Sequence, residues 1–77
     1  NYLYYMLKKN KIKIKLNGKL ISIDKGTNLS LLLKKFKFPI NKIAIEKNNL
    51  IVDKKKIKKI SLKSNDKIEI VHFIGGG

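Results

Sequence analysis

Charged and apolar residues alternate in the first predictable element of the chain. Residues 11–16, KIKIKL, place an apolar side chain at every second position, which is typical of a strand with one buried face. Asn-Gly follows at 17–18 and favours a two-residue hairpin turn, because both central positions of a type I′ turn require positive φ. A return strand is therefore predicted over 19–23. The short turn also fixes the predicted register, which pairs Leu16 with Lys19, Ile14 with Ile21 and Ile12 with Ile23.

The spacing of apolar positions changes after this hairpin. Within residues 27–37, four side chains follow the i, i+3, i+4, i+7 pattern of one helical face: Leu29, Leu32, Leu33 and Phe36. Thr27 or Asn28 can cap the first backbone donors, and Pro39 stops the helix because the residue before a proline is disfavoured in the helical region. The segment predicts one amphipathic helix over a small sheet, with Leu31 outside its apolar stripe.

The remaining apolar segments predict further strands. Residues 43–46 and 50–52 flank the turn-forming 47–49, which indicates a second strand-turn-strand unit. The segment 53–60 is too charged for a core strand; its two isoleucines predict one helical turn against the body and its lysines a solvated face. Residues 68–73 predict the last strand. Its two faces carry Ile68, Ile70 and His72 on one side and Glu69, Val71 and Phe73 on the other.

This order of elements predicts the fold class. Two strands, a helix, two more strands, a short turn or helix and a final strand follow the β-grasp order. We expect an α+β domain, a mixed sheet of four to five strands packed on one main helix, over residues 11–74. Residues 75–77 form a flexible glycine tail, and 1–10 are an N-terminal extension that is non-native or disordered. No Met stands at position 1, and Met6 is the expected natural start.

Length and composition exclude several kinds of site. With 77 residues the chain forms one domain, too small for a large internal catalytic cavity. Cys is absent, which removes disulfides, thiolate metal sites and a cysteine nucleophile. His72 has no second His or Cys beside it, so we expect no metal site.

The charge of the chain is high, with a formal net charge of +14. Such a charge favours polyanion partners in general. All 19 basic residues are Lys, however, and Arg is the residue preferred for bidentate recognition of phosphates and bases. The absence of Arg disfavours a nucleic acid partner and favours a codon bias as the origin of the lysines.

The first residues do not form a targeting or membrane segment. Residues 1–7 are apolar, but Lys8 and Lys9 follow this run, whereas in a signal peptide the positive charges precede it. The run is also too short to span a bilayer. We therefore expect no membrane partner and a cytoplasmic protein, or one of an organelle stroma if it is organelle-encoded.

The glycine tail is the feature that the fold does not explain. The sequence contains no nucleophile motif, phosphate-binding glycine loop or carboxylate pair of an autonomous enzyme, so we expect a protein that is acted upon. Gly75, Gly76 and Gly77 carry no side chains and could enter a cleft too narrow for a Cβ. A carboxylate is a poor acyl donor until its oxygen is replaced by a better leaving group. A mixed anhydride with AMP, formed by a partner enzyme with ATP, would supply one.

Four segments together resemble the ThiS family of sulfur carriers, which has a ubiquitin-like β-grasp fold: the hairpin IKLNGK, the helix TNLSLLLKKF, the segment IAIEKNNLIV and the ending IEIVHFIGGG. The resemblance extends in order from about Lys11 to Gly77. It implies a sulfur carrier for thiazole formation in thiamine biosynthesis. A ThiF-type enzyme would adenylate Gly77 with ATP, a sulfur donor protein would supply sulfur for a thiocarboxylate, and a ThiG-type thiazole synthase would accept it.

The resemblance also implies roles for the tail and its base. Gly75 and Gly76 would thread the partner's cleft, Phe73 and Ile74 would dock the partner, and no cofactor would be bound. The extra N-terminal residues and the lysines of 54–59 depart from the family pattern.

Several alternatives remain open from the sequence. The tail could be a disordered terminus or the cut end of a longer protein. A carrier resembling the small subunit of molybdopterin synthase would use the same tail with a different acceptor. A protein modifier would form isopeptide bonds to lysine. A basic RNA-binding β-grasp module would bind with a steep salt dependence and would not need the tail.

Overall fold

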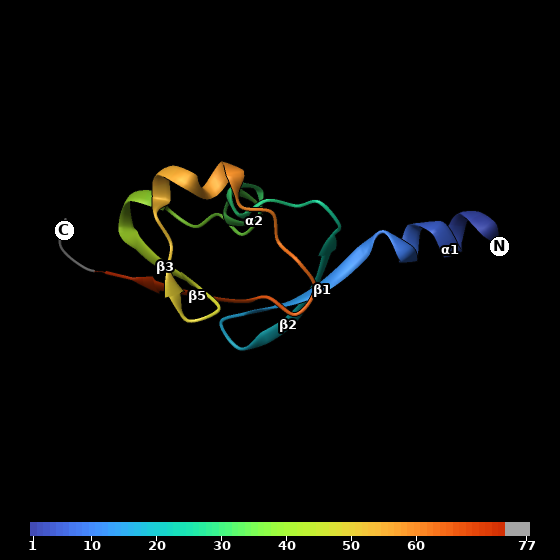
Figure 1. The fold of residues 1–77 in the computed structure, drawn as a ribbon, viewed down its shortest axis with the longest axis horizontal. Helices are drawn as coiled ribbons and strands as arrows, with labels where there is room; N and C mark the ends of the chain where they lie inside the picture. The colour runs from blue at the N-terminus through green and yellow to red at the C-terminus, as the bar shows by residue number, and fades with distance from the viewer. Residues whose placement is uncertain (74–77) are drawn as a thin grey trace.

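The computed structural model describes residues 1–73 and the side chains of these residues except 7–9. Its elements in chain order are α1 (Tyr2–Lys9), β1 (Lys11–Leu16), β2 (Lys19–Asp24), α2 (Leu29–Lys35), the 3₁₀ helix η1 (Ile40–Lys42), β3 (Ile43–Lys47), β4 (Leu50–Ile51), the 3₁₀ helix η2 (Lys54–Lys59) and β5 (Lys67–His72). The helix α1 projects away from the rest of the molecule, at the end opposite to the C-terminal end of β5 (Figure 1). The sequence analysis did not predict α1.

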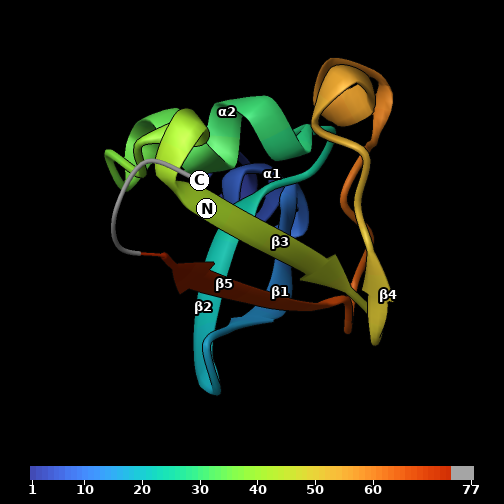
Figure 2. The ribbon, with the colours of Figure 1, turned by 90° about the vertical axis from the view of Figure 1, so that its left-hand side faces the viewer.

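The strands form one mixed sheet in the order β2-β1-β5-β3-β4. β1 and β5 are parallel, whereas β1 with β2, β3 with β5 and β3 with β4 are antiparallel. α2 and η2 lie on the same side of this sheet (Figures 1 and 2). The predicted α+β class, with five strands and one main α-helix over the sheet, is confirmed.

The first hairpin has the register predicted from its turn. Ile14 lies opposite Ile21, with Leu16 opposite Lys19 and Ile12 opposite Ile23 in the same ladder. Asn17 and Gly18 have φ values of 50° and 80°, the positive values that a type I′ turn requires. A short turn and a period-two pattern therefore decided this hairpin locally.

The core lies between α2 and one face of the sheet. Its fully buried side chains come from β1, β2, α2, β3 and β5: Ile14, Ile23, Leu29, Leu32, Leu33, Ile43, Ile45 and Ile68. The Asn28 side chain caps α2 by accepting a hydrogen bond of 2.8 Å from the Leu31 amide. Ile57 of η2 is buried as well, which confirms that this charged segment packs against the body through an isoleucine.

The prediction that Phe36 packs on the core face of the helix is wrong. Phe36 is 42% exposed, because α2 ends at Lys35 and Phe36 is its C-cap. The amide of Phe38 donates to the Leu33 carbonyl at 2.9 Å, and the amide of Lys37, at φ 58°, donates to Lys34 at 3.1 Å. These bonds form a Schellman motif, which reverses the chain and brings Phe38 back to the core instead.

Candidate functional site

The candidate site is the C-terminal end of β5, where the chain leaves the sheet. β5 lies between β1 and β3 and is therefore an inner strand. Its residues Ile68 and Ile70 are buried in the core, as their alternation predicted. A terminal segment that continues from β5 thus starts from a fixed part of the fold. Four residues of the sequence-predicted site lie outside the described residues: Ile74, Gly75, Gly76 and Gly77.

The segment between α2 and β3 holds the end of β5 in place. His72 pairs with Ile43 across the ladder, and the Phe73 amide donates a hydrogen bond of 3.0 Å to the Lys42 carbonyl. The His72 ring lies against the Phe38 ring, with centroids 5.9 Å apart and planes tilted by 42°. His72 is exposed, and its contact with Phe38 lies at the margin of the core.

A lysine from η2 also contacts this end of β5. The Lys54 ammonium lies 5.2 Å from the centroid of the Phe73 ring, within the range of a cation–π interaction. The same Nζ donates a hydrogen bond of 3.0 Å to the Ile40 carbonyl. The sequence analysis placed all lysines of η2 on a solvated face, which is wrong for Lys54 because this side chain is half-buried.

Apolar side chains are exposed on the face of the sheet opposite to the helices. Val71 is 61% exposed and lies directly across from the exposed Ala44, while Ile51 of β4 is exposed on the same face. Phe73 follows the last residue of β5 and is 37% exposed, with its ring near Lys54 of η2. Exposed aliphatic side chains on one face of a sheet, close in the chain to an exposed aromatic residue, are expected of a protein-docking surface.

Two carboxylates interrupt this apolar face. Glu46 of β3 lies directly opposite Glu69 of β5, and both are half-buried. Like charges directly opposite each other in a sheet are unfavourable, and the part of the chain that the structure describes provides no ion pair to either glutamate. This face of the sheet therefore carries exposed apolar side chains and two negative charges, although the protein as a whole is strongly basic.

An ion pair that shifts a pKa lies far from the C-terminal end of β5, at the start of the first hairpin. The Lys11 ammonium donates a hydrogen bond to the Asp24 carboxylate, and this bond, together with the positive charge of Lys11, lowers the pKa of Asp24. Both side chains are exposed to solvent. They lie where β1 begins and β2 ends, beside α1, so this pair belongs to the hairpin and not to the end of β5.

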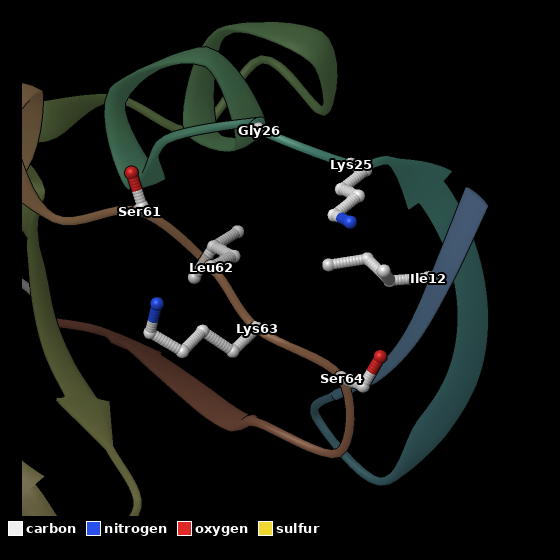
Figure 3. A pocket seen from close by; sticks show the side chains of 7 residues that line it. All are labelled: Ile12, Lys25, Gly26, Ser61, Leu62, Lys63 and Ser64. Carbon is white, nitrogen blue, oxygen red and sulfur yellow. The ribbon is translucent and has the colours of Figure 1, made fainter. Parts of the chain in front are cut away.

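A depression of about 410 Å³ lies between the hairpin and the segment that precedes β5. Lys25 and Ile12 reach into it from the hairpin side and face Leu62 (Figure 3). Its lining is completed by Gly26, Ser61, Lys63 and Ser64. It is remote from the C-terminal end of β5, because β1 begins at the opposite end of the sheet, and it contains no catalytic set of side chains.

The described residues contain neither a metal-binding cluster nor a membrane-spanning helix. Residues 1–73 contain no group of three or more His, Cys, Asp or Glu that could hold a metal ion. Within the same part of the chain, no helix is both long enough and apolar enough to cross a membrane.

Comparisons with known proteins converge on one family. The model of the ThiS family matches residues 14–77. The sulfur carrier protein ThiS of Bacillus subtilis is 35% identical over 65 residues, which cover 83% of this chain and 98% of that protein. The crystal structure of the thiamine biosynthesis protein ThiS from Geobacter metallireducens superposes with a TM-score of 0.75 at 25% identity, over 86% of this chain and all of that one.

A longer protein also matches. A thiazole synthase of Magnetococcus marinus is 41% identical over 66 residues, or 86% of this chain. The chain spans only 20% of the length of that relative.

Proposed function

This chain belongs to the ThiS family, and we propose that it carries sulfur for thiamine biosynthesis on the carboxylate of Gly77. The family match extends through Gly77 and therefore includes the whole glycine tail. The observation that carries the proposal is the position of β5. An inner strand anchored in the core brings Phe73, the last described residue, to the margin of the sheet, close to an exposed apolar surface.

The tail is suited to chemistry in the active site of another protein. Three glycines reach about 10 Å when extended, and they present no side chain to the walls of a cleft. In the proposed activation, an oxygen of the Gly77 carboxylate attacks the α-phosphorus of ATP and pyrophosphate leaves. Hydrosulfide, the simplest sulfur donor, then attacks the acyl carbon and displaces AMP, which leaves a thiocarboxylate and a proton. A ThiF-type adenylating enzyme would supply the ATP site, and the carrier itself would bind no cofactor.

The acceptor of the sulfur would be a ThiG-type thiazole synthase. A thiazole synthase from another organism contains a segment similar to this chain within its own sequence. The presence of both units in one polypeptide supports a functional association between such a carrier and that class of enzyme.

The exposed apolar face supports a docking role for Phe73. Val71 lies near the end of β5 and Phe73 directly follows this strand, so a partner that covers them is held within a few residues of the glycine tail. Ile74 would extend the same contact. Phe73→Ser should weaken partner binding by roughly 10- to 100-fold, because aromatic anchors dominate such interfaces.

The proposal is tested by intact mass spectrometry after incubation with ATP, hydrosulfide and a ThiF-type enzyme. We expect a mass increase equal to the exchange of one oxygen for one sulfur, localised to Gly77. Deletion of Gly77 should abolish this increase and leave the circular-dichroism spectrum unchanged. A variant without Gly77 that still transfers sulfur, or a wild-type chain that an active enzyme fails to modify, would refute the proposal.

A further inference from the structure

One lysine connects the end of β5 to the segment that precedes β3. Lys54 Nζ donates to the Ile40 carbonyl at 3.0 Å and lies 5.2 Å from the centre of the Phe73 ring. Among the lysines whose side chains the structure describes, Lys47 and Lys54 are the two that are half-buried. The other lysines of η2 are exposed, so the position of Lys54 is not a general property of this basic segment.

The start of η2 keeps Lys54 in this position. The Asp53 side chain accepts a hydrogen bond of 3.0 Å from the Lys55 amide and so caps the helix at the residue before Lys54. Ile57, one turn later, is buried in the core. The backbone of Lys54 is therefore anchored on both sides, and its side chain extends along the body toward the end of β5.

Phe73 has two separate contacts, one with Lys42 of η1 and one with Lys54 of η2. Its amide donates to the Lys42 carbonyl, while its ring faces the ammonium that is bound to the Ile40 carbonyl. The first contact fixes the backbone of Phe73 and the second fixes its ring. Loss of the Lys54 ammonium would remove the cation from the Phe73 ring and leave the hydrogen bond between the Phe73 amide and the Lys42 carbonyl.

We propose that Lys54 is a positioning residue for sulfur loading, which holds Phe73 in the orientation from which the chain continues to Gly77. This inference rests on the proposed function. An enzyme with a narrow cleft accepts the tail only from carriers whose chain leaves the sheet in a suitable direction. When the fraction of competent molecules falls, the apparent affinity falls by the same factor, although the chemical step of a bound tail is unchanged.

The test compares the adenylation kinetics of four chains, measured as pyrophosphate release by a ThiF-type enzyme. Lys54→Met keeps most of the side-chain stem and removes the ammonium, whereas Lys54→Arg keeps both a donor and a cation for the ring. Lys56→Met removes the same charge from an exposed site of the same helix and is the matched control. For Lys54→Met we expect KM to rise roughly tenfold and kcat to stay within about twofold of wild type. Lys54→Arg should retain most of the wild-type KM.

A second measurement does not depend on activity. The order parameter of the Phe73 ring, from ¹³C relaxation of its aromatic carbons, should fall in Lys54→Met and stay at its wild-type value in Lys56→Met. An unchanged KM for Lys54→Met would overturn the proposal. An equal rise of KM in Lys54→Met and Lys56→Met would overturn it as well, because it would indicate only a general attraction between the lysines and the enzyme. An unchanged order parameter would overturn it as well. If the wild-type chain is not adenylated at all, the proposed function fails, whereas the order parameter still tests the contact between Lys54 and Phe73.

Discussion

Leu32 and Leu31 are adjacent leucines of α2 that should respond very differently to truncation. Leu32 is fully buried between α2 and the sheet, whereas Leu31 is 53% exposed. Replacement of a buried leucine by alanine removes apolar surface and leaves a cavity, which typically costs about 2 to 5 kcal/mol. Replacement at an exposed helical position costs within about 0.5 kcal/mol. Alanine has a helix propensity slightly higher than that of leucine, so propensity does not account for a loss at either site.

The difference is measured by urea unfolding and by thermal unfolding of Leu32→Ala, Leu31→Ala and wild type, both followed by circular dichroism. In a domain of this size each 1 kcal/mol lowers Tm by about 4 to 8 °C, so Leu32→Ala should lose at least about 8 °C. Leu31→Ala should remain within about 4 °C of wild type. Equal losses for the two variants, or a loss below about 1 kcal/mol for Leu32→Ala, would refute the assignment of the buried helix face.

Two further predictions concern the ends of α2 and of the first hairpin. Lys37→Gly should raise the free energy of unfolding by about 0.5 to 1 kcal/mol, measured by urea titration. The reason is that Lys37 occupies the left-handed C′ position at φ 58°, which glycine adopts without strain. A less stable variant would contradict the assignment of Lys37 as a strained C′ residue. The Lys11 contact holds the pKa of Asp24 below its ordinary value of 3.8, so it stabilises the fold above that pH and this contribution is lost as the pH falls through the folded-state pKa. The free energies of unfolding of wild type and Lys11→Met, measured from pH 7 to pH 2, should differ less as the pH falls into this acidic range. For Lys13→Met, which removes an exposed lysine of the same strand, the difference from wild type should change less with pH. Parallel pH profiles for the two variants would show that the Lys11–Asp24 contact does not cause the pH dependence.

Local patterns predicted much of the fold. The Asn-Gly turn set the register of the first hairpin, and the spacing of Leu29, Leu32 and Leu33 identified the buried face of α2. These predictions succeeded because a two-residue turn and a helical stripe act over a few neighbouring residues. The resemblance to the family rested on the ending as well, and the family model extends to Gly77. The roles of the tail residues stay predictions.

The end of α2 was decided by hydrogen bonds that the apolar pattern does not encode. Periodicity continued the helical stripe to Phe36, but the Schellman motif stopped the helix one residue earlier and exposed this ring. A pattern of apolar residues shows which face is buried only for as long as the helix continues. The helix ended where the chain could satisfy its last carbonyls and return Phe38 to the core.

The sequence by itself determined which elements form and which face of most of them is apolar, because each of these properties depends on residues close together in the chain. Only the tertiary structure decided which polar side chains join distant segments. Asn17 accepts a hydrogen bond of 2.7 Å from the amide of Ile70, and Asn48 donates one of 3.0 Å to the buried carboxylate of Asp66. Lys54 is one of several lysines in a row that look alike in the sequence. It differs from them because folding brings the Ile40 carbonyl and the Phe73 ring within reach of its ammonium.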